Sequence, residues 1–391
     1  MAARTIHPFP ARMAPDIAID QVGVSSSSRK LRVLDPMCGS GTVLGAASAK
    51  GHDAQGLDID PLAVLMSRVA TQPIDFDAFD QEVESVIAHA RTMTTEVPRW
   101  DDPETLKFST YWFAPKQRVQ LNHLSRAIDN VGAKAVKDAL QVALSRIIVT
   151  KAQTASLAQD TSHSRPHRVA DDSDYDVYSG FMKSAGALSR LLSKRTLIGT
   201  VNVELGDARA TGLRGSSIDL TVTSPPYLNA IDYLRGHKMS LIWLGYTIPI
   251  LRKIRASSIG AERALDREAQ PEVESIIEFI TASVDDPSLL PIHTLKRYAD
   301  DLTCFATELH RVSRAGGRVV TVIGNSTLRG NYIENDKIVK LAYENAGFSL
   351  VERTERLLPE NRRYLPTKMT GSNLALSKRM RTEVVLVMRK A

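Results

Sequence analysis

The sequence predicts an α/β protein in which a largely helical insertion separates the two halves of a seven-stranded sheet. Three observations indicate this fold. A strand, a glycine turn, a helix and a second strand follow one another within residues 31–60. From residue 62 to about residue 200, apolar residues recur at helical spacing instead. Strands and helices then alternate again, and the last two strands are close enough to form an antiparallel hairpin.

The composition of the 391-residue chain is that of a globular protein, with 43% hydrophobic residues. No apolar run approaches the ~20 residues that a membrane span needs. The first residues also lack the apolar stretch of a secretory signal. Cys38 and Cys304 lie far apart in the sequence, which argues against a disulfide framework. We therefore expect a cytoplasmic protein without a transmembrane helix.

The first βα unit carries the pattern of a nucleoside site. A strand at residues 31–34 and a helix at 43–50 flank a loop that reads Asp35-Pro36-Met37-Cys38-Gly39-Ser40-Gly41-Thr42. Glycines let the backbone approach a ligand, and the helix N-terminus offers free N–H donors. The second strand, residues 54–57, ends at Asp58, where doubly wound folds bind ribose hydroxyls. Glycines that serve only packing are the alternative, and no Walker-type lysine follows.

The segment that precedes this unit and the insertion that follows it are less specific. Residues 7–15 form a proline-spaced aromatic stretch, which predicts an ordered arm before a short helix. Helical spacing within the insertion is found at residues 62–71, 79–94, 115–131 and 133–150. His163 and His167 stand near several aspartates, but they flank a proline in a basic tract, so the sequence predicts no metal site. We expect that tract to contact substrate or to cover a cofactor.

After the insertion, the alternation of strands and helices resumes. Strands are predicted at residues 201–205, 218–222 and 318–323, with a hairpin of residues 349–355 and 383–388. Residues 236–296 are predicted to be helical and charged, and helices are predicted at 298–314 and 336–346. The pair Gly316-Gly317 suits a C-cap of the first of these two helices.

The strand at residues 218–222 leads directly into Thr223-Ser224-Pro225-Pro226-Tyr227. Two consecutive prolines end the strand ladder and prevent immediate helix entry, so the chain must form a fixed extended turn. The Ser224 hydroxyl and the Pro225 carbonyl could accept the two hydrogens of an exocyclic amine, while Tyr227 stacks on the ring that bears it. A proline turn with Tyr227 as a core residue is the alternative.

Positive charge is concentrated near the C-terminus. The formal net charge is +6, and residues 351–391 carry ten Lys or Arg against four Glu. No acid occurs between Asn361 and Arg381. The cations of this basic loop are Arg362, Arg363, Lys368, Lys378, Arg379 and Arg381. Such a patch is typical of contact with a polyanion such as nucleic acid, and a solvated surface loop is the alternative.

With the glycine loop and the proline motif together, the sequence resembles the S-adenosylmethionine-dependent DNA amino-methyltransferases, particularly those that methylate cytosine N4. The loop at residues 35–42 is similar to the cofactor loop of that family, and residues 223–227 are similar to its catalytic motif. Residues 7–15 are similar to its cofactor-covering segment. The resemblance covers residues 1–60 and 200–391, and the insertion corresponds in position to the target-recognition region of one permutation class.

This resemblance implies a seven-stranded Rossmann-like methyltransferase sheet with the last strand antiparallel, and S-adenosylmethionine as cofactor. It implies a catalytic role for Ser224, Pro225, Pro226 and Tyr227. The implied cofactor contacts are His7, Pro8, Phe9, Asp35, Pro36, Cys38, Gly39, Gly41, Thr42, Asp58, Ile59, Asp207 and Ala208. The implied partner is duplex DNA with a flipped base, bound by the basic loop together with Arg165 and Arg168, and restriction or defence proteins are further candidate partners. The expected divisions are residues 1–61, 62–200 and 201–391.

Three alternatives remain open at the level of sequence. Asp or Asn in place of Ser224 is commoner in the adenine-N6 enzymes, so a serine favours cytosine. The Asp35–Gly39 part of the loop also resembles certain RNA guanine-N2 methyltransferases, whose catalytic motif ends in Tyr-Gly, whereas Leu228 follows Tyr227 here. A methyltransferase-like protein that binds nucleic acid without catalysis would need a broken motif. DNA cytosine-N4 methylation is therefore the prediction.

Overall fold

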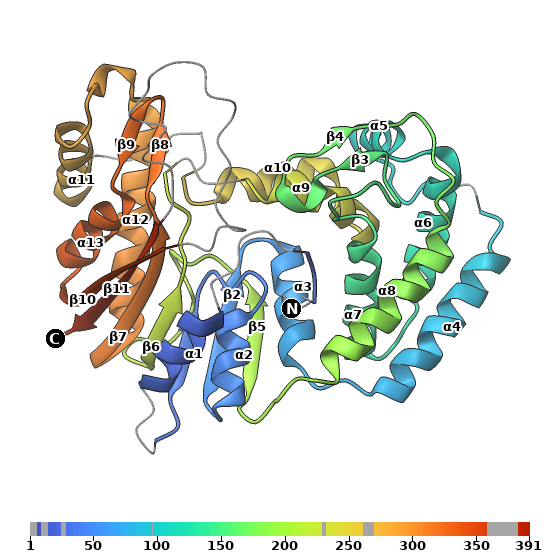
Figure 1. Ribbon diagram of the computed structural model, residues 1–391, viewed down its shortest axis with the longest axis horizontal. Coiled ribbons are helices and arrows are strands. Elements are labelled where there is room, and N and C mark those ends of the chain that lie inside the picture. The colour runs from blue at the N-terminus through green and yellow to red at the C-terminus, as the bar shows by residue number, and fades with distance from the viewer. Residues whose placement is uncertain are drawn as a thin grey trace.

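The computed structural model describes residues 6–8, 15–24, 29–95, 97–228, 232–260, 270–357 and 382–391. A seven-stranded sheet dominates one half of the molecule and a cluster of helices the other (Figure 1). The strand order is β10 (Phe348–Leu357), β11 (Thr382–Lys390), β7 (Ser313–Gly324), β6 (Ile218–Thr223), β1 (Arg32–Asp35), β2 (Asp53–Asp58) and β5 (Val201–Leu205). Strand β11 is antiparallel to both of its neighbours, and β7, β6, β1, β2 and β5 are mutually parallel. The predicted seven-stranded Rossmann-like sheet, with an antiparallel last strand, is confirmed.

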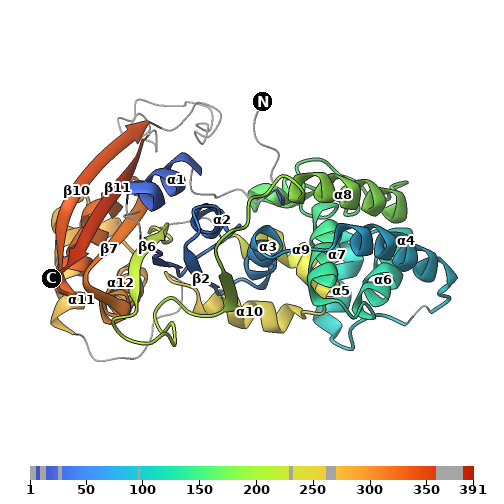
Figure 2. The same ribbon diagram turned by 90° about the horizontal axis from the view of Figure 1, so that it is seen from below.

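Helices cover both faces of this sheet (Figure 2). One face carries α1 (Pro15–Val24), α2 (Thr42–Ala49) and α3 (Pro61–Thr71), and the other carries α11 (Pro271–Ala282), α12 (Ile292–Val312) and α13 (Asn335–Asn345). Successive side chains of a strand point to opposite faces. Along β7, Val320 and Val322 accordingly join the core under α1 and α2, whereas Val319 and Ile323 join the core under α12 and α13. This two-sided burial explains why the strands are rich in β-branched residues.

The helical cluster contains most of the insertion, so the predicted helical character of residues 62–200 is confirmed. Its helices are α4 (Phe76–Thr92), α5 (Pro103–Trp112), α6 (Pro115–Asp129), α7 (Lys134–Arg146) and α8 (Val177–Leu192), together with α9 (Leu234–Leu241) and α10 (Ile248–Ser257). The last two come from the segment after the proline motif. Trp243, which follows α9, packs edge-on against Trp100 with ring centroids 4.9 Å apart. The Trp100 indole also donates to the carbonyl of Ile242 at 2.9 Å.

One predicted helix end is wrong. Helix α12 ends at Val312, and β7 begins at Ser313, so Gly316 and Gly317 lie inside a strand rather than at a helix C-cap. The register between β6 and β7 shifts in this region, and Gly316 has a φ of +70°. A left-handed glycine fits such a strand irregularity as well as it fits a cap. The sequence alone therefore does not distinguish a helix C-cap from a strand irregularity at this position.

Two helices and two strand pairs were not predicted individually. They are α5 and α8, the strand pair β3 (Ala158–Gln159) and β4 (His167–Arg168), and the hairpin of β8 (Ser326–Leu328) and β9 (Asn331–Ile333). The predicted C-terminal hairpin is confirmed, because β10 and β11 pair in antiparallel fashion. Within the described ranges, no helix has the length and apolar character that would let it cross a membrane.

Candidate active site

The predicted site residues gather at the carboxyl edge of the parallel strands. Asp35 is the last residue of β1, Asp58 the last of β2 and Thr223 the last of β6. The chain proceeds from β1 to β2 on one side and reaches β6 on the other side of β1. Ligands of open α/β sheets bind at such a switch point, outside the carboxyl ends of the strands. The glycine turn, Asp58 and the proline motif therefore share one edge.

The glycine turn after β1 is held in place by three hydrogen bonds. The N–H of Cys38 donates to the carbonyl of Leu57 at 2.8 Å, and the N–H of Gly39 donates to Oδ2 of Asp58 at 2.9 Å. The hydroxyl of Ser67 on α3 donates to the Gly39 carbonyl at 2.9 Å. Gly41 has a φ of +78°, in the left-handed region, and Thr42 then begins α2. The turn thus directs the first N–H groups of α2 toward the same edge.

The carboxylate of Asp58 is held in place by hydrogen bonds but can accept more of them. Its Oδ2 accepts from Gly39, and its Oδ1 accepts from the N–H of Asp60 at 2.9 Å. An ionised carboxylate offers about four lone-pair directions, so acceptor capacity remains for further donors. Ile59, between the two acids, is half-buried. This arrangement suits a pair of ligand hydroxyl groups.

Burial shifts the two strand-end acids toward neutrality. Burial is the main cause that raises the pKa of Asp35 to about 7, opposed by the hydrogen bond from the Met37 N–H and by the nearby hydroxyl of Thr223. Burial, followed by the charge of Asp60, raises the pKa of Asp58 to about 6. Burial and both acids raise the pKa of the Cys38 thiol, which therefore stays protonated. Each acid binds its proton more tightly in the folded than in the unfolded chain. Protonation of either acid therefore stabilises the fold at low pH, and this stabilisation is lost as the pH rises through the folded pKa.

The proline motif is braced from both sides of the turn. Tyr298 donates to the carbonyl of Pro226 at 3.3 Å, and the N–H of Leu228 donates to Oδ1 of Asn335 at 3.1 Å. Ser326 donates to the carbonyl of Leu228 at 2.7 Å. Pro225 is buried, and Tyr227 is half-buried against the core under α12 and α13. The predicted fixed turn is present, and the ring of Tyr227 contributes to packing as well.

Ser224 is exposed at this turn, and its hydroxyl has a defined orientation. The hydroxyl donates to the carbonyl of Val322 on β7 at 2.8 Å. A serine hydroxyl has one hydrogen and two lone pairs. Because the hydrogen is directed to Val322, the side facing solvent can act only as an acceptor. An amine N–H is the kind of group that such an oxygen can receive.

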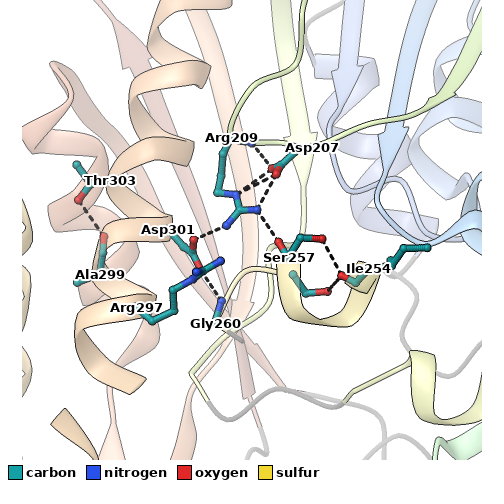
Figure 3. A network of polar contacts seen from close by, with 10 residues as sticks. Asp207, Arg209, Ile254, Ser257, Gly260, Arg297, Ala299, Asp301 and Thr303 are labelled. Atoms are coloured by element: carbon teal, nitrogen blue, oxygen red, sulfur yellow. Dashed lines mark hydrogen bonds and ion pairs between the residues drawn. The ribbon is translucent and has the colours of Figure 1, made fainter. Parts of the chain in front are cut away.

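Asp207 and Ala208 follow β5, where the adenine side of the cofactor was expected. Arg209 Nε lies 3.0 Å from Asp207 Oδ1, and its Nη2 lies 2.6 Å from Oδ2 (Figure 3). Burial favours the neutral acid, but the hydrogen bonds and charge of Arg209 hold the pKa of Asp207 below its usual value. Arg209 also pairs with Asp301 on α12, whose Oδ2 accepts from Arg297 at 2.9 Å. Asp207 is therefore ionised and locked, and Ala208 is buried beside it.

The described part of the N-terminal segment lies against the helical cluster. His7 is buried, and its Nε2 lies 2.8 Å from the Ser145 hydroxyl on α7. Arg146 donates to the carbonyl of Ile6. Pro8 is half-buried, whereas Phe9 lies outside the described residues. The ring of His7 also faces the ring of His237 on α9, with centroids 6.5 Å apart.

The predicted nucleic-acid contacts are only partly described. Arg165 and Arg168 are exposed on the helical half, where Arg168 pairs with Asp171 at 3.2 Å and lies 5.1 Å from the centroid of the Tyr111 ring. Ser164 donates to the Tyr233 carbonyl at 3.3 Å, which ties this tract to the segment after the proline motif. All six cations of the basic loop lie outside the described residues. Among the residues that are described, no three His, Cys, Asp or Glu side chains are grouped to hold a metal ion.

Sequence reasoning missed the residues that support this edge. Asp60 caps α3 by accepting from the N–H of Leu62 at 2.9 Å, and Pro61 follows it as the first helical residue. Asp before Pro is a helix-start signal, so Asp60 could have been found. His237 and Asn335 come from distant segments and carry no local signal in the sequence.

No family model matches the sequence. The type II methyltransferase M.MvaI of Kocuria varians is 22% identical to this chain over 422 residues, covering 98% of this chain and 90% of that protein. The chain is similar to a methyltransferase over nearly its whole length. A solved SAM-dependent methyltransferase from Methanosarcina mazei is 10% identical, with 97% of this chain and 99% of that chain covered and a TM-score of 0.36. A putative DNA modification methylase from Thermus thermophilus is 19% identical, with 47% and 52% covered and a TM-score of 0.24.

Proposed function

We propose that this protein transfers a methyl group from S-adenosylmethionine to an exocyclic amine of a DNA base, with cytosine N4 as the target. The observation that carries the proposal is the convergence of the glycine turn, Asp58 and the proline motif at one sheet edge. The similarity to M.MvaI along the chain supports methyl transfer as the class of reaction. A glycine turn alone would be compatible with many ligands.

The donor groups at this edge fit the proposed cofactor. Asp58 has spare acceptor capacity for the two ribose hydroxyls, and the glycine turn admits close approach of a ligand. The adenine side is assigned to Asp207 and Ala208, and the remaining contacts to the loop of residues 35–42 and to residues 7–9. When bound, the cofactor supplies an electrophilic methyl group on a sulfonium. The chain's own residues then have to present the base.

Ser224 and Pro225 are proposed to act on the base amine. The lone pair of such an amine is delocalised into the ring, so the nitrogen is a poor nucleophile. Two acceptors, the Ser224 hydroxyl and the Pro225 carbonyl, favour a pyramidal nitrogen whose lone pair points toward the methyl group. Pro226 fixes the turn, and Tyr227 stacks on the flipped base. The proton is lost late in the transfer, so no strong base is required.

The target base is proposed from the proline motif, and the DNA contacts are proposed from the position of the insertion and from its basic residues and those of the basic loop. Serine at position 224 favours cytosine N4, with adenine N6 and RNA guanine N2 as the competing targets. Residues 62–200 are proposed to carry target recognition, assisted by Arg165, Arg168 and the basic loop. A restriction endonuclease or another defence protein would be the natural partner of such an enzyme.

Product analysis tests this proposal directly. The full chain is incubated with tritiated S-adenosylmethionine and separate DNA and RNA pools, which are then digested to nucleosides. We expect label in DNA as N4-methylcytosine. N6-methyladenine would overturn the assignment of the base, and N2-methylguanine in RNA would overturn the nucleic-acid class. Absence of label in both pools would leave no support for catalysis.

Cofactor affinity should depend on pH through Asp58. Since its pKa is raised to about 6, the carboxylate is ionised above neutrality and becomes protonated as pH falls through 6. We expect the Kd for S-adenosylhomocysteine to rise by up to about tenfold per pH unit below that point, because a neutral acid accepts hydrogen bonds more weakly. Calorimetric titrations from pH 8 to pH 5 measure this. Asp58→Asn should bind weakly at every pH and lack this dependence, and an unchanged profile would remove Asp58 from the site.

A further inference from the structure

A chain of hydrogen bonds connects the acid at the end of β2 with the helical cluster. His237 on α9 is 1% exposed, and its Nδ1 lies 2.5 Å from Oδ2 of Asp60. The other oxygen of Asp60 caps α3 at Leu62, and the Asp60 N–H donates to Asp58. Because carboxylate oxygens only accept, the imidazole donates from Nδ1. His237 thus positions Asp60, and Asp60 in turn positions Asp58.

The backbone of His237 is connected to α7 as well. The hydroxyl of Ser240 donates to the His237 carbonyl at 3.2 Å, and the hydroxyl of Ser145 on α7 donates to Ser240 at 2.9 Å. His7 in turn contacts Ser145, and its ring stands at 89° to that of His237. Three segments that are far apart in sequence therefore meet around one buried imidazole. Its position depends on the packing of α9 against α7.

His237 also affects the charge state of Asp58. Burial is the largest effect on that acid, and the nearby charge of Asp60 adds to it in the same direction, whereas His237 lowers the pKa of Asp58. Two carboxylates so close together repel each other, and a donor or cation beside one of them reduces that repulsion. Loss of the imidazole would therefore both release Asp60 and disfavour ionised Asp58.

We propose that His237 is a positioning residue of the cofactor site, which acts on Asp58 through Asp60 and makes cofactor affinity depend on the seating of α9. The inference rests on the proposed function, in which Asp58 accepts from the ribose hydroxyls. Helix α9 belongs to the segment that follows the proline motif. The same helix therefore connects the turn that presents the target base with the acid that binds the cofactor, and any coupling between the two ligands through it must be reciprocal.

Four variants of the full chain test this role by calorimetry with S-adenosylhomocysteine. His237→Phe keeps an aromatic ring and removes the donor, and we expect about a tenfold increase in Kd, the size expected for one hydrogen bond to a charged group. His237→Asn places an amide N–H near the position of Nδ1 and should restore most of the affinity. In an Asp60→Asn background, His237→Phe should have little further effect, because the histidine acts through Asp60. In turnover, His237→Phe should raise the KM for the cofactor more than it lowers kcat.

His123 provides the matched control. It is buried in α6 of the same helical cluster, and its Nε2 lies 2.8 Å from the carbonyl of Thr95. His123→Phe should bind the ligand like the wild type, and equal losses in His123→Phe and His237→Phe would show general loosening and overturn the inference. Wild-type affinity in His237→Phe would overturn it as well. If His237→Phe does not fold, unchanged affinity of Asp60→Asn overturns it. A wild-type chain that binds no ligand would instead refute the proposed function.

Discussion

Ser224→Ala is expected to lower the single-turnover methylation rate about a hundredfold while DNA affinity stays within about twofold. In the proposed mechanism the hydroxyl accepts an amine hydrogen, and this contact matters most as the nitrogen becomes pyramidal, so its loss should affect the transition state more than binding. Tyr227→Ala should behave differently. Loss of base stacking is worth roughly 1–3 kcal/mol and should weaken binding of the flipped base as well as slow the reaction. Rapid-quench kinetics and binding titrations on one duplex separate the two effects.

Ser326→Ala is the control for this pair of variants. Ser326 supports the same turn through the Leu228 carbonyl and has no role in the proposed chemistry. If the proline motif served only structure, all three variants would lose thermal stability and the folded fraction would methylate normally. Ser224→Ala and Tyr227→Ala proteins that fold, bind cofactor and react at the wild-type rate would exclude this turn from the active site.

Gly41→Val is expected to weaken S-adenosylmethionine binding by at least about tenfold and to lower the melting temperature. A Cβ at Gly41 would stand 3.0 Å from Oγ and 3.1 Å from Cα of Ser67, and the second atom belongs to the backbone of α3. The φ of +78° adds a conformational cost of about 1–2 kcal/mol for an L-residue, and a β-branched one fits worst. The turn must shift, and the N–H donors of α2 shift with it. Calorimetry and thermal denaturation measure both effects.

Gly45→Ala is the matched control on the same helix. A Cβ at Gly45 meets no atom within 4 Å beyond the backbone of its own helix turn, and alanine is favoured over glycine inside a helix by about 0.5–1 kcal/mol. We expect equal or higher stability and unchanged cofactor affinity. Normal binding by Gly41→Val would mean that the glycine turn does not contact the cofactor.

The elements predicted best from the sequence are those whose signals are local. The turn at Asp35–Thr42 and the proline motif depend on residues that restrict their own backbone, so their positions at strand ends followed directly. The supporting contacts could not be predicted in this way. Asn335, which receives the N–H of Leu228, lies 107 residues from it in sequence. Contacts between residues so far apart depend on the folded arrangement of the chain, and no local pattern in the sequence indicates them.

The misplaced end of α12 has a related cause. Gly316-Gly317 satisfies the local rule for a helix C-cap, but β7 pairs with β6 on both sides of it and with β11 directly after it. Strand pairing buries long apolar runs and so overrides a local preference for a turn. Helix α8 was missed for the opposite reason. It follows an acidic tract that reads as a loop, although Asp176 at the end of that tract caps the helix by accepting from the N–H of Ser179.

After the proline motif the chain returns to the helical cluster, and this has a consequence for any exchange of the proposed target-recognition region between related proteins. Trp243 and its neighbours fill the space between Trp100 and Phe113, and Ser125 donates to the Trp243 carbonyl. A transplant of residues 62–200 alone into a related enzyme would therefore leave a hole where these rings pack. Chimaeras should exchange residues 234–257 together with the insertion, so that both halves of this aromatic contact come from the same parent.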